Sequence, residues 1–165
     1  MISLSGGAGV MAADALERDG LSIKALSAGT LSVIREKSPV WASPSNPLDI
    51  EPLTETVGFV QGYTIGLEAL LSDGGVDSCI VQHGSMFRTE DQIRFVFEAR
   101  ERHPDVPIAV CILGDQGVYD ELFVLYERNR IPVYPTVERA ARALAALNRR
   151  RHYLARLPKE GRASN

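Results

Sequence analysis

The sequence is poor in the residues that build disulfide frameworks and metal centres. Among its 165 residues are only two cysteines and three histidines. Cys79 and Cys111 both lie in apolar, strand-like runs, and the sequence has neither a C-x-x-C motif nor a Cys/His cluster. We therefore expect two buried, reduced thiols rather than a disulfide or a metal site.

Long hydrophobic runs are missing as well. The longest, such as residues 107–113, have the length of a strand, whereas a membrane-spanning helix needs about 20 residues. The N-terminus has no basic region followed by an apolar segment and a cleavage site, so we expect no signal peptide and a cytoplasmic location. The net charge of −3 gives no indication of broad affinity for nucleic acid or anionic membranes.

The hydrophobic content of 45% and the charged content of 24% are those of one ordinary globular domain. Along the chain, short β-like runs alternate with helical stretches, which predicts an α/β fold: a three-layer, doubly wound parallel sheet of about five strands. We place this single domain at residues 1–150. Residues 151–165 are expected to be a basic helix end and a disordered tail.

The periodicity predicts individual elements. Strands are expected at residues 2–4, 22–25, 78–82, 108–113 and 132–134. Helices are expected at about residues 8–18, 27–37, 63–71, 89–102 and 118–129, with a last helix opening at Thr136. Residues 40–60 are rich in Pro, Ser and Thr and lack strong periodicity, which predicts a long loop.

The clearest chemical signal is the glycine-rich turn at residues 5–9, between the first strand and the first helix. N–H groups at a helix N-terminus attract anions, and glycine lets a phosphate approach them. Residues 7–12 also fit the G-x-G-x-x-G/A dinucleotide fingerprint, but residues 23–27 supply no acid to hold a ribose. A phosphate or phosphoryl site is the favoured interpretation, with a dinucleotide site or a turn without ligand as alternatives. A P-loop is excluded because G-K-[ST] is missing.

Ligands of open α/β sheets bind beyond the carboxyl ends of the strands, where residues 5–9, 83–87 and 114–117 are expected to meet. His83, followed by Gly84 and Ser85, would lie at this ligand edge. Its imidazole could contact a phosphate or accept a phosphoryl group, or simply stabilise the loop. The sequence shows no set of nucleophile, base and oxyanion hole, so we assign no catalytic residue.

Three weaker patterns have structural explanations beside functional ones. The run Asn46-Pro47-Leu48-Asp49-Ile50 can lock a turn through side-chain hydrogen bonds. Asp115, Asp120 and Glu121 are interpreted as solvated helix-capping acids, with magnesium binding as the alternative. The arginines at 149–151 are interpreted as a solvated helix end rather than a nucleic-acid patch.

Four segments together carry a family resemblance. They are residues 5–16 (SGGAGVMAADAL), 46–50 (NPLDI), 68–78 (EALLSDGGVDS) and 131–144 (IPVYPTVERAARAL). They resemble the NDP-forming acyl-CoA synthetases, relatives of succinyl-CoA synthetase, and the resemblance covers about residues 2–147. The match is to one module of those enzymes, the flavodoxin-like domain that follows the phosphohistidine domain.

The resemblance implies roles for several residues. In the family a phosphoryl group passes through a histidine on a mobile loop, and the glycine-rich helix N-terminus faces that phosphohistidine. Here Gly6, Gly7, Ala8 and Gly9 would supply the N–H groups, a role that preorganised amides can fill without a titrating side chain. Asn46 and Asp49 would shape the neighbouring loop. CoA, ATP or ADP and magnesium are implied for the whole enzyme, and none of them is expected to bind this domain alone.

The sequence also departs from the family. It has no Ser-His-Thr-Gly phosphohistidine loop, since His83 lies in Gln-His-Gly-Ser, and it has no CoA-binding Rossmann domain or ATP-grasp domain. We expect a module that is inactive alone and works with CoA-binding, phosphohistidine and ATP-grasp domains or subunits; a homo-oligomer is also compatible with the sequence. The alternatives are a non-catalytic regulatory module that binds an anion or nucleotide, and a nucleotide-dependent oxidoreductase domain.

Overall fold

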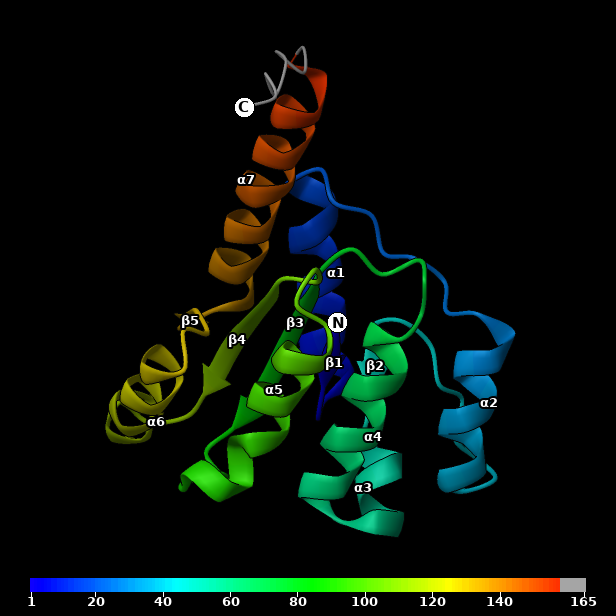
Figure 1. Cartoon of the computed structure of the whole chain (residues 1–165). Helices are drawn as coiled ribbons and strands as arrows, with labels where there is room; N and C mark the ends of the chain where they lie inside the picture. The colour runs from blue at the N-terminus through cyan, green and yellow to red at the C-terminus, as the bar shows by residue number, and fades with distance from the viewer. Residues whose placement is uncertain (158–165) are drawn as a thin grey trace, which may run out of the picture.

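The computed structural model describes residues 1–157 and shows one parallel sheet covered by helices on both faces (Figure 1). The strands are β1 (Ile2–Ser3), β2 (Leu48–Asp49), β3 (Cys79–Gly84), β4 (Ile108–Leu113) and β5 (Val133–Tyr134). The helices are α1 (Gly6–Arg18), α2 (Ala28–Lys37), α3 (Glu51–Val57), α4 (Phe59–Leu71), α5 (Glu90–Arg102), α6 (Gln116–Arg128) and α7 (Val137–Arg156). The strand order is β2-β1-β3-β4-β5, so the expected doubly wound five-stranded fold is confirmed.

Two hydrophobic clusters fill the space on the two faces of the sheet. Under α1 and α7 the cluster is rich in alanine, with Ala12 and Ala141 fully buried, and this lets the two helices pack against each other. The opposite cluster, under α3 to α6, holds larger side chains such as Tyr63 and Leu67. Burial of each large aliphatic side chain contributes roughly 1.5–3 kcal/mol to this core.

Helix starts follow the capping residues. The Ser27 hydroxyl accepts the Thr30 N–H at 3.2 Å, and the Asp115 carboxylate accepts the Val118 N–H at 3.0 Å. Thr89 forms a capping box with Gln92 at the start of α5. These side chains satisfy N–H groups that a helix leaves free in its first turn.

The expectation for the second strand was wrong. Residues 22–25 form no strand, because β2 occupies the place beside β1; Ile23 packs against the α1/α7 cluster and Leu26 lies in the opposite one. The second strand in sequence is instead β2, inside the stretch expected to be a loop, which also holds α3 and the start of α4. β2 is fixed by pairing, since the Leu48 N–H donates to the Met1 carbonyl at 2.8 Å and the Ile50 N–H to the Ser3 carbonyl at 2.9 Å.

The parallel strands give the sheet two unlike edges. The carboxyl edge, toward the bottom of Figure 1, carries the N-termini of α1, α5 and α6, and the strand order reverses there between β1 and β3. At the opposite amino edge, α7 continues past the sheet to Arg156 (Figure 1). The tail expected after α7 falls on residues 158–165, outside the described residues. Within residues 1–157, no helix combines the length and the apolar character needed to cross a membrane.

Candidate functional site

The glycine-rich turn follows β1 at the carboxyl edge, beside the point where the strand order reverses. The Ser3 hydroxyl donates to the Ser5 carbonyl at 2.9 Å, and the same carbonyl accepts the Gly9 N–H at 3.1 Å. The Ser5 hydroxyl accepts the Ala8 N–H over a long 3.5 Å. Within residues 1–157, the N–H groups of Gly6 and Gly7 have no acceptor, and both glycines are exposed. The turn therefore presents two free donors at the positive end of a 13-residue helix.

Glycine is favoured at positions 6, 7 and 9 of this turn for different physical reasons. A Cβ at Gly6 would lie 3.2 Å from the Asp49 carboxylate, and a Cβ at Gly9 would lie 3.2 Å from the Pro47 Cβ. These two glycines let β2 and the proline before it approach α1. A Cβ at Gly7 would have only an ordinary contact, 3.7 Å from the Ser5 hydroxyl. Packing thus does not require glycine at position 7, where the missing side chain leaves the N–H open.

The structure separates the two residues expected to shape the neighbouring loop. Asp49 lies beside the glycine turn, and its carboxylate also accepts the Glu51 N–H at 3.0 Å. Asn46 lies at the amino edge, where its amide donates to the Lys24 carbonyl and accepts from the Met1 amino group, both at 2.9 Å. Only Asp49 is therefore close enough to affect an anion at the turn.

The position of Asp49 also corrects an argument against dinucleotide binding. Residues 23–27, around the expected end of the second strand, contain no acid. The true β2 ends on Asp49, a carboxylate next to the glycine turn. A missing acid therefore does not exclude a dinucleotide, and the decision rests on the family to which the chain belongs.

His83 lies in the core instead of facing a ligand. Its side chain is fully buried on the face covered by α4, α5 and α6, with the ring of Phe87 centred 5.2 Å away. Nδ1 lies 3.1 Å from the Gly84 carbonyl and Nε2 lies 2.8 Å from the Tyr126 hydroxyl. Because a carbonyl only accepts, Nδ1 carries the proton and Nε2 accepts from Tyr126. Burial lowers the pKa of His83 to about 4, so the ring is neutral at pH 7.

Gly84, the last residue of β3, and Ser85, which follows it, do reach the carboxyl edge. A Cβ at Gly114, in the turn after β4, would lie 3.0 Å from the Ser85 Cβ, so these two turns are packed together. Asp115 caps α6, as its capping interpretation predicts, and Asp120 accepts from the Gln116 amide at 2.7 Å. Residues 1–157 contain no group of three His, Cys, Asp or Glu side chains placed to hold a metal ion.

Neither remaining histidine lies at the carboxyl edge. His103 follows α5 at the amino edge, where Nε2 lies 2.8 Å from the Glu68 carboxylate. His152 lies on the projecting part of α7. The glycine turn consequently has no histidine of this chain beside it.

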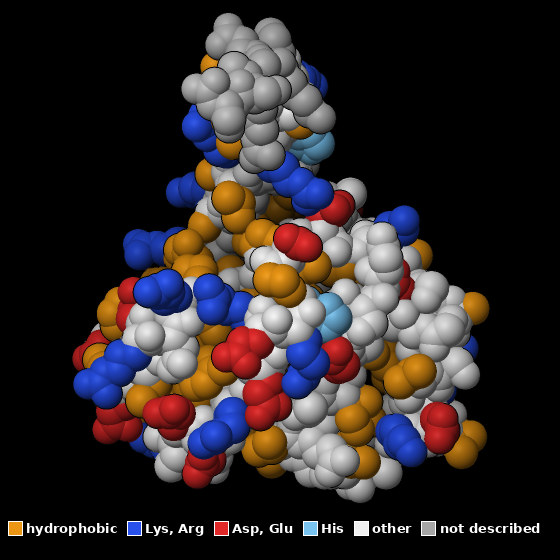
Figure 2. All heavy atoms as spheres, in the orientation of Figure 1, with side chains coloured by type: hydrophobic (Ala, Val, Ile, Leu, Met, Phe, Trp, Pro, Cys, Tyr) orange, Lys and Arg blue, Asp and Glu red, His pale blue; other side chains and the backbone are white. Residues whose placement is uncertain are grey.

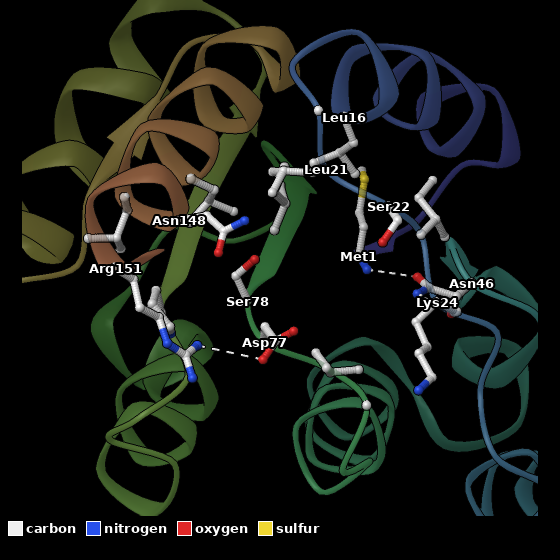
Figure 3. Close-up of a pocket in the computed structure, with 18 of the residues that line it drawn as sticks. Met1, Leu16, Leu21, Ser22, Lys24, Asn46, Asp77, Ser78, Asn148 and Arg151 are labelled. Carbon is white, nitrogen blue, oxygen red and sulfur yellow. Dashed lines mark hydrogen bonds and ion pairs between the residues drawn. The ribbon is translucent and has the colours of Figure 1, made fainter. Parts of the chain in front are cut away.

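Sequence reasoning missed a cavity of about 400 Å³ at the amino edge. Figure 3 shows it between α7, which contributes Asn148 and Arg151, and the segment that carries Ser22 and Lys24. Leu16, Leu21 and Met1 line it further in. One signal in the sequence could have indicated it: the apolar spacing of the last helix continues into the arginine-rich end of that helix, which gives this end an apolar face as well.

The buried side-chain oxygen of Gln82 belongs to none of the sequence motifs. The Gln82 side-chain oxygen is inaccessible to solvent and has no hydrogen-bond partner among residues 1–157. Strand alternation puts Gln82 on the face covered by α1 and α7, with Cys111 opposite it in β4. Its amide therefore lies in an apolar layer rather than at the exposed carboxyl edge.

Comparisons with known proteins identify the family. Residues 1–158 match the Ligase-CoA domain. The chain is 29% identical over 149 residues to the acetate–CoA ligase [ADP-forming] II of Archaeoglobus fulgidus, covering 90% of this chain and 22% of that protein. It is 29% identical over 150 residues to the alpha subunit of acetate–CoA ligase [ADP-forming] I of Pyrococcus furiosus, covering 89% of this chain and 31% of that subunit.

Solved structures agree with this assignment. The dinucleotide forming acetyl-coenzyme A synthetase 1 of Ca. Korarchaeum cryptofilum, in its apo form, superposes with a TM-score of 0.75 at 26% identity, over 93% of this chain and 34% of that one. Its complex with phosphate and ADP gives a TM-score of 0.73 at 25% identity, over 93% and 33% of the two chains. The chain spans less than a third of the curated relatives that it matches. It belongs to the Ligase-CoA domain family, whose members among the matched proteins are ADP-forming acetate–CoA ligases.

Proposed function

We propose that this domain binds, at the N-terminus of α1, the phosphoryl group of a phosphohistidine or acyl phosphate supplied by another part of an ADP-forming acyl-CoA synthetase. The observation that carries the proposal is the pair of free N–H groups at Gly6 and Gly7, exposed at the carboxyl edge. Preorganised amides at a helix N-terminus stabilise a transferring phosphoryl group without reorganisation.

The phosphoryl donor has to come from outside this domain. His83 is buried, uncharged and engaged on both ring nitrogens, and His103 and His152 lie away from the glycine turn. We therefore propose that the domain is inactive alone and completes a site with CoA-binding, phosphohistidine and ATP-grasp domains or subunits. CoA, ATP and magnesium belong, in this proposal, to the other domains.

The turn supports a role in transfer better than a role in storing free phosphate. Asp49 places a negative charge next to Gly6, which opposes a second anion. A phosphoryl group that is covalently attached to a carrier is held in place by that carrier, so it needs little affinity of its own for the glycine turn. The amides then act on the charge that shifts during transfer.

The test combines Gly7→Val with a matched control. Gly29 is the second residue of α2 and lies two residues after the cap Ser27, just as Gly7 lies two residues after Ser5; its added Cβ would be 3.9 Å from the Ser27 hydroxyl. Acyl-CoA formation from the acid, CoA and ATP is measured for this chain alone and for the full synthetase. Activity is expected only in the full synthetase, abolished by Gly7→Val and kept by Gly29→Val.

Binding is followed separately, by titrating the isolated chain with inorganic phosphate and recording the amide signals of Gly6 and Gly7. Unchanged phosphate shifts in Gly7→Val would overturn the proposed site. Inactivity of the full synthetase with retained phosphate shifts would support the alternative, a non-catalytic anion-binding module.

A further inference from the structure

The second half of α7, from residue 146 to Arg156, projects beyond the sheet and is called projecting α7 here. It continues an apolar stripe that is buried in the first half of the helix. Val137, Ala140 and Leu144 are at most 6% exposed against the domain, whereas Leu147 and Leu154 are each 48% exposed. All five follow the three- and four-residue spacing of one helix face. Scattered apolar residues on a surface need no explanation, but a core-facing stripe that runs on into solvent is typical of an interface.

The exposed stripe borders the amino-edge cavity. Leu144, Leu147 and Arg151 of α7 form one wall, and Lys24 stands on the opposite side (Figure 3). Leu16 and Leu21 line the space between them. A helix or extended segment that covered Leu147 could thus place apolar side chains in the cavity.

The charge of this surface selects its occupant. Residues 146–157 contain four arginines, at 149, 150, 151 and 156, and no acid. Figure 2 shows Lys and Arg side chains on both sides of projecting α7, with hydrophobic side chains between them. Within residues 1–157, only one acid pairs with these arginines: Asp77, whose carboxylate lies 3.6 Å from the Arg151 guanidinium. The Asp77 side chain is 82% exposed. Lys24 forms no ion pair with any acid of these residues. An exposed pair of this kind contributes little and is easily replaced.

We propose that projecting α7 and the adjoining cavity are the docking site of an acidic amphipathic helix from another domain or subunit of the synthetase. Its apolar face would cover Leu147 and Leu154, and its carboxylates would face Arg150, Arg151 and Lys24. Packing of projecting α7 against the same surface of a second copy is disfavoured, because it would bring together two arginine-rich segments, residues 146–157 of each chain, that contain no acid. That the partner belongs to the synthetase rests on the proposed function, whereas the binding chemistry rests on this surface alone.

The test uses a defined probe. The probe is a fluorescent peptide of about three heptads, with Leu at positions a and d and Glu at positions e and g. Repulsion between its glutamates keeps the peptide from forming a coiled coil with itself. The chain is titrated into it and binding is recorded. We expect saturable binding that weakens with salt and falls about tenfold or more in Leu147→Asp/Leu154→Asp and in Arg150→Glu/Arg151→Glu. Val33→Asp, at a 51% exposed apolar position of α2, is the matched control and should bind like the parent chain.

Several results would overturn the docking site. One is equal binding of a peptide with Lys in place of Glu, and another is equal loss in Val33→Asp. A third is a dimer of the parent chain, seen by light scattering, that Leu147→Asp/Leu154→Asp converts to monomers, because a second copy would then be the occupant. Thermal melts check that the variants fold. If peptide binding fails while the full synthetase keeps its Gly7-dependent activity, the docking site is wrong and the proposed function stands.

Discussion

The carboxylate of Asp73 accepts the N–H of Ser27 at 2.8 Å, across 46 residues of sequence, and so fixes the start of α2 to the turn after α4. The same carboxylate accepts the Thr30 hydroxyl at 2.8 Å and the Gly75 N–H at 3.1 Å. These hydrogen bonds, that from Ser27 foremost, lower the pKa of Asp73 to about 2. Asp73, one of three acids in the 68–78 segment, thus has a structural role at the amino edge.

Asp73→Ala should lower the free energy of unfolding by about 1–3 kcal/mol, because it leaves three donors without their acceptor. Urea unfolding measures the loss. Asp77→Ala, whose side chain is 82% exposed, is the control and should stay near the parent value. The unfolded chain protonates Asp73 at a higher pH than the folded chain, so this contribution is present above about pH 4 and disappears as the pH falls toward 2. Equal stability of the two variants at pH 7 would contradict this role.

His83 predicts a second, separate pH window. The folded chain binds the proton only near pH 4, whereas an unfolded histidine binds it near 6.5. Stability should therefore fall as the pH is lowered from 6.5 to 4, by up to about 3 kcal/mol. Chemical denaturation at a series of pH values measures this slope.

His83→Phe removes the titrating group while it keeps a ring in the aromatic cluster. It should be less stable at pH 7, since the Tyr126 hydroxyl and the Gly84 carbonyl lose their partner, but its stability should change less between pH 6.5 and 4. A variant with the parent slope would show that another group causes the pH dependence.

Gly62 and Gly29 should respond to alanine with opposite signs. A Cβ at Gly62 would lie 2.7 Å from the Thr54 Cγ2 and 3.3 Å from its Cα and N, and the Thr54 hydroxyl is fixed by its bond to the Glu51 carbonyl at 2.8 Å. Overpacking of about 1–3 kcal/mol should exceed the helix propensity gained, about 1 kcal/mol. Gly29→Ala meets no such contact and should stabilise the chain. Thermal melts of both variants decide, and a higher melting temperature for Gly62→Ala would contradict the close approach of α3 and α4.

Asp49→Asn should strengthen phosphate binding at the glycine turn. The substitution removes a charge beside Gly6 and keeps an acceptor for the Glu51 N–H. We expect an increase of about two- to fivefold in the affinity for inorganic phosphate at low salt, which shrinks as salt is added. The amide titration described for Gly7→Val measures it, and weaker binding by Asp49→Asn would place the anion elsewhere.

Local signals predicted much of this fold. β4 has the bounds predicted for it, residues 108–113, and Ser27, Thr89 and Asp115 cap the helices that follow them. A cap or a buried strand is decided within a few residues. The glycine turn was found for the same reason, because strand, glycines and helix follow one another directly.

Features decided by distant contacts were not predicted. β2 is a strand only because Met1 and Ser3 offer it carbonyls, and its two residues carry no periodicity of their own. His83 looked like an edge residue because it comes near the end of β3. Alternation with Cys79 and Val81, which face the same core, was the signal for its burial, but the aromatic partners come from other helices.

Both outer strands of the sheet, β2 and β5, are only two residues long. A ladder this short offers an incoming chain almost no row of backbone donors and acceptors, and Pro47 just before β2 removes one donor more. Sheet extension from one molecule to the next is thereby disfavoured. Contacts with other chains are therefore made by side chains on helices and turns, and such contacts can be specific and reversible. The shortness of the two outer strands also protects the domain from fibrous aggregation.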